Sequence, residues 1–72
     1  MKIDYDPEAN AVYIQLRSGE VDDTVASSEY IFVDVDDAGV PLGVEILFAD
    51  RVLAGDDIAS VTVNVGSKAV PA

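Results

Sequence analysis

Two β-hairpins can be recognised in this chain, and they constrain its fold more than any other feature. In the first, apolar and polar residues alternate over residues 2–5 and 12–16, on either side of a turn that contains a proline. In the second, the mainly apolar residues 30–35 and 40–48 flank Asp36-Asp37-Ala38-Gly39. A period of two is the spacing of β-strands, and Pro and Gly are typical of the turns between them. The pattern therefore predicts two antiparallel hairpins.

The second hairpin allows the more detailed prediction. Its turn has the sequence of a type I turn followed by a left-handed glycine, so Gly39 should have a positive φ angle. In the strand that follows, Pro41 and Gly43 disfavour a central position and indicate an edge strand or a bulge. In the first hairpin, Ile14 lies between polar neighbours and is predicted to be buried.

The remaining segments are shorter. Residues 24–26 are predicted to form an edge strand, residues 49–54 a short helix with Gly55 as its C-cap, and residues 61–65 a last strand. We therefore predict a mostly β fold at the margin of the α+β class, a small antiparallel sheet of two hairpins with one short helix and a C-terminal strand. Residues 1–66 should form a single domain, and residues 67–72 a flexible tail.

The amino-acid composition indicates that the fold needs support from a partner. In a domain as small as this 72-residue chain, a single hydrophobic core rarely supplies more than about 3–5 kcal/mol. Small domains compensate with disulfides, a metal or a second subunit. The sequence contains neither Cys nor His, which excludes disulfides and removes the thiolate and imidazole ligands of metals. A partner subunit is therefore the expected supplement.

The charge of the chain limits the classes of partner. The formal net charge is −10, from 14 acidic and 4 basic residues. Nucleic-acid phosphates and anionic membrane surfaces would repel such a protein, so we expect it to bind neither. No apolar run approaches the length of a membrane-spanning helix. We expect a cytoplasmic protein.

Acidic residues near the two turns are the candidates for a site. Asp34, Asp36, Gly39 and Glu45 have the spacing of a calcium-binding loop, and a second acidic group occupies residues 4–8. The hairpins explain both groups better, because acidic side chains cap turns by accepting backbone N–H bonds. Without His, the serines also lack the usual general base. We therefore expect no catalytic residues, no metal, no cofactor and no enzymatic activity.

Apolar surface points to self-association. Residues 30–33 are apolar on both faces of their strand, and so are residues 46–48. Such strands need cover on both sides, which one short helix cannot provide. We therefore expect a homo-oligomer, most simply a symmetric dimer. The candidate interface consists of Tyr30, Phe32, Leu47 and Phe48, unless these side chains face the C-terminal segment.

Two motifs occur in order in the first part of the chain. One is YDPEANAVYI at residues 5–14, and the other is VDVDDAG at residues 33–39 followed by GVEIL at residues 43–47. Together they resemble a family of small bacterial domains of unknown function, DUF2283, over roughly residues 1–50. Asn10 stands where an acid is common in that family. The family has no established activity, but some members are encoded near small toxin-like proteins, and the resemblance thus implies a protein-binding role.

The favoured function is a non-enzymatic protein-interaction module. It would act through homo-oligomerisation or through a protein partner, and the more specific hypothesis is that it neutralises a small protein, as an antitoxin does. The alternative is a small-ligand or cation-binding protein that uses the acidic hairpin turns.

Overall fold

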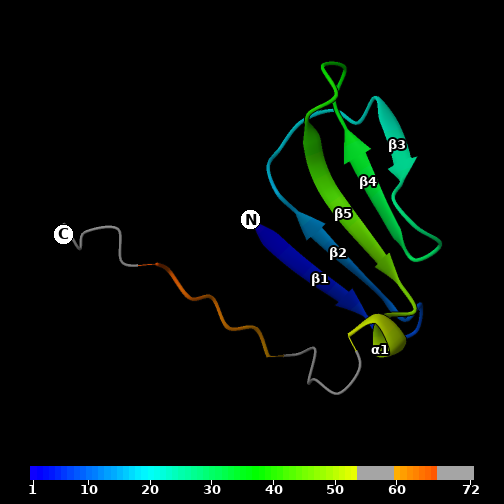
Figure 1. Ribbon diagram of the computed structural model, residues 1–72, viewed down its shortest axis with the longest axis vertical. Coiled ribbons are helices and arrows are strands. Elements are labelled where there is room, and N and C mark those ends of the chain that lie inside the picture. The colour runs from blue at the N-terminus through cyan, green and yellow to red at the C-terminus, as the bar shows by residue number, and fades with distance from the viewer. Residues whose placement is uncertain (54–59, 67–72) are drawn as a thin grey trace.

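The computed structural model describes residues 1–53 and 60–66, in which five antiparallel strands form one open sheet and a short helix lies at one end (Figure 1). The strands are β1 (Lys2–Asp6), β2 (Ala11–Gln15), β3 (Asp23–Ala26), β4 (Ile31–Val35) and β5 (Pro41–Leu47), and the helix is α1 (Ala49–Val52). Their order across the sheet is β1-β2-β5-β4-β3. The predicted mostly β class and both hairpins are confirmed.

Both hairpin turns are closed by an aspartate. In the first turn, Asp6 Oδ1 accepts hydrogen bonds from the N–H groups of Glu8 and Ala9, at 3.0 and 3.2 Å. In the second, Gly39 N–H donates to the Asp36 carbonyl at 2.9 Å, and the φ angle of Gly39 is +80°. The positive φ predicted for this glycine is confirmed.

Strand β5 is the centre of the sheet, not an edge. It pairs with β2 on one side and with β4 on the other, so the edge position that Pro41 and Gly43 suggested is wrong. The alternative prediction, a bulge, is confirmed: Gly43 opposes Asp34 and Pro41 opposes Val35, which leaves Leu42 without an opposed residue on β4. Pro41 is tolerated because it is the first residue of the strand, where a missing N–H donor matters least.

The connection from β2 to β3 runs past the start of β5 to reach the far edge of the sheet (Figure 1). It is fastened by the Leu42 carbonyl, which accepts hydrogen bonds from the N–H groups of Leu16 and Arg17, and by Asp22 N–H, which donates to the Val35 carbonyl. Leu42 is buried beside Gly19. Strand β3 is an edge strand, as predicted.

The hydrophobic core lies where α1 meets the sheet. It consists of Val12, Ile46 and Ala49, and Ile14 is only half-buried at its margin. The prediction that Ile14 is buried is therefore wrong, because α1 covers only one end of this face of the sheet. The predicted helix is confirmed over Ala49–Val52, while its predicted C-cap, Gly55, lies outside the described residues.

The predicted C-terminal strand is not formed. Residues 60–66 belong to no strand, and every one of them is exposed. Alternating valines give a segment the capacity to form a strand, but a strand also needs an edge to pair with, and these residues have no such pairing here. The predicted tail at residues 67–72 lies outside the described residues. Within residues 1–53 and 60–66, no helix has the length and apolarity needed to cross a membrane.

Candidate functional site

One face of the sheet is built from apolar side chains on all five strands. Because opposed residues in antiparallel strands point to the same side, the strand pairing places these residues in rows. The first row, which we call the open row, is Ile3, Ile14, Val44, Val33 and Val25. The second, the covered row, is Tyr5, Val12, Ile46 and Ile31. Together the two rows define the apolar face.

Helix α1 packs on the covered row. Ala49 is fully buried against Val12 and Ile46, and Val52 and Leu53 pack beside them. Nothing in the described part of the chain packs over the open row in this way. None of its five side chains is buried, and its ends, Ile3 and Val25, are 39% and 50% exposed. The row crosses four inter-strand spacings, or about 19 Å. It is a strip of β-branched residues that is half-buried in the middle, where Ile14 and Val44 pack against the core, and exposed at its ends.

Asn10 holds α1 in place over the covered row. Its φ angle of +53° is left-handed, a conformation that Asn tolerates better than most residues. Its Oδ1 accepts a hydrogen bond from Asp50 N–H at 3.0 Å, its Nδ2 donates to Asp50 Oδ1 at 2.6 Å, and its carbonyl accepts from Ala49 N–H at 2.8 Å. The first turn of α1 is therefore capped by a residue from the first hairpin.

The opposite face of the sheet carries a polar network across four strands. The Tyr13 hydroxyl on β2 donates to Asp34 Oδ2 on β4 at 2.8 Å, and Thr24 Oγ1 on β3 donates to Asp34 Oδ1 at 2.6 Å. To reach Asp34, the tyrosine ring lies directly over Gly43 of β5, so closely that a Cβ atom on this residue would overlap the hydroxyl oxygen. The hydrogen bond to Asp34, followed by burial and the charges of Asp34 and Glu45, raises the pKa of Tyr13.

The four residues predicted from the sequence as an interface lie on this second face, away from the apolar face. Tyr30 and Phe48 contact each other edge to face, with ring centroids 5.8 Å apart and planes at 88°. Phe32 and Leu47 lie on neighbouring strands of the same face, where Leu47 N–H donates to the Tyr30 carbonyl at 2.8 Å. Phe48 is 56% exposed. That these residues form an interface stays a prediction.

Phe48 also has an unusual backbone. Its φ and ψ angles are both 52°, a left-handed conformation that is rare for a bulky residue. This conformation reverses the chain between β5 and α1. As a result, α1 folds back over the apolar face while the Phe48 ring stays beside Tyr30 on the other face.

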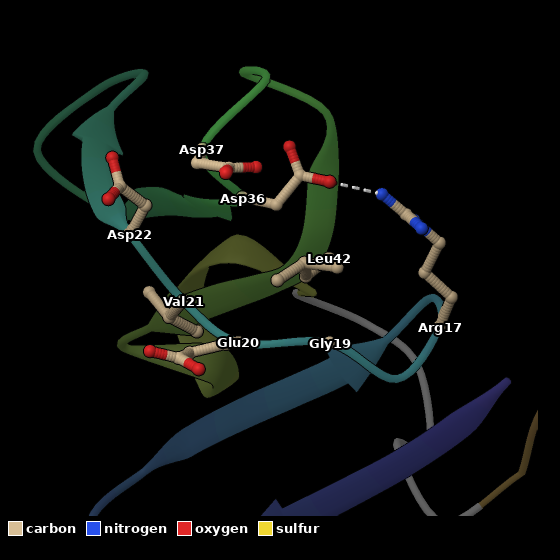
Figure 2. A pocket seen from close by; sticks show the side chains of 8 residues that line it. All are labelled: Arg17, Gly19, Glu20, Val21, Asp22, Asp36, Asp37 and Leu42. Atoms are coloured by element: carbon tan, nitrogen blue, oxygen red, sulfur yellow. Dashed lines mark hydrogen bonds and ion pairs between the residues drawn. The ribbon is translucent and has the colours of Figure 1, made fainter.

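The acidic second turn forms one wall of a shallow depression of about 390 Å³ (Figure 2). Its lining residues are Arg17, Gly19, Glu20, Val21, Asp22, Asp36, Asp37 and Leu42. Both carboxylate oxygens of Asp36 already have partners within the protein. One carboxylate oxygen accepts from the N–H groups of Ala38 and Val40, both at 2.9 Å, and the other pairs with Arg17. The Val40 N–H above all, then the Ala38 N–H and Arg17, hold the pKa of Asp36 below its ordinary value.

Two of the carboxylates with the calcium-like spacing, those of Asp34 and Asp36, are thus used for structure. Asp36 closes the turn, and both oxygens of Asp34 accept hydrogen bonds from side chains of the sheet. Among residues 1–53 and 60–66, no three acidic side chains are grouped closely enough to hold one metal ion. The turn is better described as a capped hairpin with an ion pair at its rim.

Sequence reasoning missed the open row as a site. The signal was present in part, because each strand shows its own alternation, but the row exists only once the order β1-β2-β5-β4-β3 is known. The Asn10–Asp50 and Tyr13–Asp34 pairs had no signal, since they join residues 40 and 21 positions apart.

Comparison with known proteins identifies one family. The model of the family described as "Protein of unknown function (DUF2283)" matches residues 2–49. No curated protein and no solved structure shows significant similarity to the chain. The match covers the whole sheet and ends at the first residue of α1.

Proposed function

The chain belongs to the DUF2283 family of proteins of unknown function, and from its surface we propose that it is a non-enzymatic protein-interaction module. The observation that carries the proposal is the open row, five β-branched side chains that cross the sheet, none of them buried and the two at its ends exposed. Apolar strips of this kind are typical of surfaces that bind another protein. The absence of His and Cys from the sequence supports the non-enzymatic part of the proposal.

The first partner that we propose is a second copy of the chain. A flat apolar face can pack on its own copy about a two-fold axis, with the two sheets about 10 Å apart. Such a dimer would bury the open row of both copies at once. It would also enlarge a small core, since Val12, Leu42, Ile46 and Ala49 are the only buried apolar residues in the described part of the chain.

In its finer form, the proposal is that the module neutralises a small protein partner, as an antitoxin does. The same apolar face would bind that partner. The net charge of −10 favours a partner of positive charge, because opposite charges accelerate encounter and suppress incorrect partners.

A matched pair of variants on β3 tests the proposal. Val25→Glu places a charge at the end of the open row, whereas Ala26→Glu places the same charge one residue away on the opposite face. In light scattering at micromolar concentration, we expect wild type and Ala26→Glu to be dimers and Val25→Glu to be shifted towards the 7.6 kDa monomer. Chromatography coupled to the light scattering, together with circular dichroism, would verify that both variants keep the sheet.

Two outcomes would contradict self-association through the apolar face. One is a wild-type mass of 7.6 kDa throughout the concentration range. The other is a dimer that Phe48→Glu dissociates and Val25→Glu does not, which would assign the interface to the aromatic residues of the opposite face. Phe48 suits this comparison because its side chain is largely exposed.

A further inference from the structure

Residues 61–65 have the properties of a strand but belong to no sheet. Val61, Val63 and Val65 alternate with Thr62 and Asn64, so four of the five residues are β-branched and the apolar ones share one side. The three valines are 58%, 69% and 85% exposed. A single strand is not stable alone in water, because its backbone and its apolar side both need a partner. The segment is therefore suited to complete another sheet.

The sheet offers a matching edge at β1. This strand pairs only with β2, so the N–H and C=O groups on its outer side have no partner in the described sheet. All five of its residues are exposed. Its apolar residues, Ile3 and Tyr5, lie on the apolar face, whereas Lys2, Asp4 and Asp6 lie on the other. The edge and the segment thus have equal length and both alternate with a period of two, but in opposite phase. A register shifted by one residue from full overlap therefore places valines opposite Ile3 and Tyr5.

The other edge fits less well. Strand β3 has four residues, one fewer than the segment, and only Val25 among them is a large apolar residue on the apolar face. The position that would flank a second valine is Asp23. An added strand with three valines on one side would therefore meet two large apolar neighbours on β1 but only one on β3.

We propose that residues 61–65 of one copy add to the outer edge of β1 in a second copy, as a sixth antiparallel strand. The valines lie on the apolar face beside Ile3 and Tyr5, and Thr62 and Asn64 lie beside the charged residues of β1. A second copy is the donor because, within one chain, residues 60–66 are exposed and make no ladder hydrogen bond to β1. A reciprocal exchange pairs the β1 edge of each copy with the segment of the other copy, so the dimer is closed.

The inference rests on the proposed function, since it names how the second copy is held. It also adds something to it: the exchanged strand lengthens the apolar face of each copy and blocks an edge that could otherwise recruit further chains. The segment carries no charged residue, so its addition brings no further repulsion to a chain of charge −10.

Engineered cysteine pairs test the arrangement cleanly, because the sequence contains no Cys. Opposed residues on adjacent strands have Cβ atoms about 4.5–5.5 Å apart, close enough for a disulfide to form with small adjustment. Val63→Cys is combined with Ile3→Cys, with Tyr5→Cys or, as the control, with Asp4→Cys. Asp4 lies between the two test positions but on the opposite face.

We expect mild oxidation to produce a disulfide-linked dimer with the Ile3 or the Tyr5 variant, and little with the Asp4 variant. The product should have twice the mass of the 7.6 kDa chain and should disappear under reducing conditions. Equal cross-linking of all three pairs, or none, would overturn the proposal. A disulfide within one chain would overturn the assignment of the donor to a second copy.

Val63→Pro provides a second test that does not depend on cross-linking. Proline removes the N–H donor of the proposed strand, while residue 63 makes no contribution to the sheet of its own chain. We expect the dimer dissociation constant to rise about tenfold or more, as for the loss of a substantial contact. Ser60→Pro, just before the segment, should have little effect.

The two proposals fail in different ways. If Val25→Glu dissociates the dimer and Val63→Pro does not, the apolar face is the interface and the strand exchange is refuted. If wild type is a monomer, both are refuted.

Discussion

At the scale of single residues, two side chains connect parts of the fold that are distant in the sequence. Asn10 joins the first hairpin to α1, and Tyr13 joins β2 to β4 across the central strand. Both act through hydrogen bonds between residues that are far apart in the sequence. Each bond can be tested by a substitution that keeps the size of the side chain.

Asn10→Asp should destabilise the protein although an aspartate has the same shape. The new carboxylate still accepts from Asp50 N–H, but it loses the donor that faces Asp50 Oδ1 at 2.6 Å and brings two negative charges together. We expect the free energy of unfolding to fall by about 1 kcal/mol, the usual contribution of one hydrogen bond. Chemical denaturation would measure it. Adding Asp50→Asn should restore most of the loss, and a double variant no better than Asn10→Asp would refute the pairing.

Deprotonation of Tyr13 should destabilise the folded protein at alkaline pH. Its pKa is raised, mainly by the hydrogen bond to Asp34, from an ordinary value of 10.0. A raised pKa in the folded state means that this stabilisation is complete below pH 10.0 and is lost as the pH rises through the folded value. The chain has three Tyr and no Trp, so phenolate absorbance reports the titration directly. Tyr13→Phe should remove a component that titrates above pH 10.0, and Asp34→Asn should move that component to lower pH.

At the scale of the elements, the two hairpins show which structure can be predicted from a sequence. Their turns were predictable because Gly39 and the capping aspartates act on residues within four positions, and their strands because alternation is local. The central position of β5 was not predictable from the same rules. Gly43 weakens a strand in isolation, yet here it provides the space that the Tyr13 ring occupies.

The C-terminal segment shows the converse limit. The alternation of Val61, Val63 and Val65 predicts a strand, but no local pattern specifies which edge it pairs with or in which molecule. The same holds for the candidate site. The two-sided apolarity of residues 30–33 indicated an interface, but the open row depends on a strand order that brings Ile3 and Val25 to opposite ends of one strip.

Gly43→Ala should be costly for a reason that its position in a strand does not reveal. The new Cβ would overlap the Tyr13 ring, so the ring must move from the position in which its hydroxyl donates to Asp34. We expect a loss of about 1–3 kcal/mol, as for other overpacked sites, measured by thermal or chemical unfolding. In a Tyr13→Ala background the same substitution should be nearly neutral. An equal cost in both backgrounds would show that the ring is not the obstacle.

At the scale of the whole molecule, the stability of the fold is expected to depend on association. A sheet with one covered end has little core of its own, so the dimer would contribute to the folded state by mass action. Electrostatic repulsion opposes both folding and dimer formation. The chain carries a net charge of −10, and the ion pairs found in its described part are Arg17–Asp36 and Lys2–Asp4, the second long and exposed. Charge repulsion acts both within one copy and between two.

Salt should therefore raise both the melting temperature and the fraction of dimer. Raising NaCl from about 0.01 M to about 0.15 M shortens the Debye length from about 30 Å to about 8 Å, which screens exposed like charges. Calorimetry and light scattering at one fixed protein concentration would follow the two quantities. Calcium should do no more than magnesium at equal ionic strength, because Asp34 and Asp36 already accept hydrogen bonds from the protein. A fall in dimer with added NaCl would instead mean that Lys2 or Arg17 forms attractive pairs across the interface, and a calcium-specific rise in melting temperature would restore cation binding at the second turn as the function.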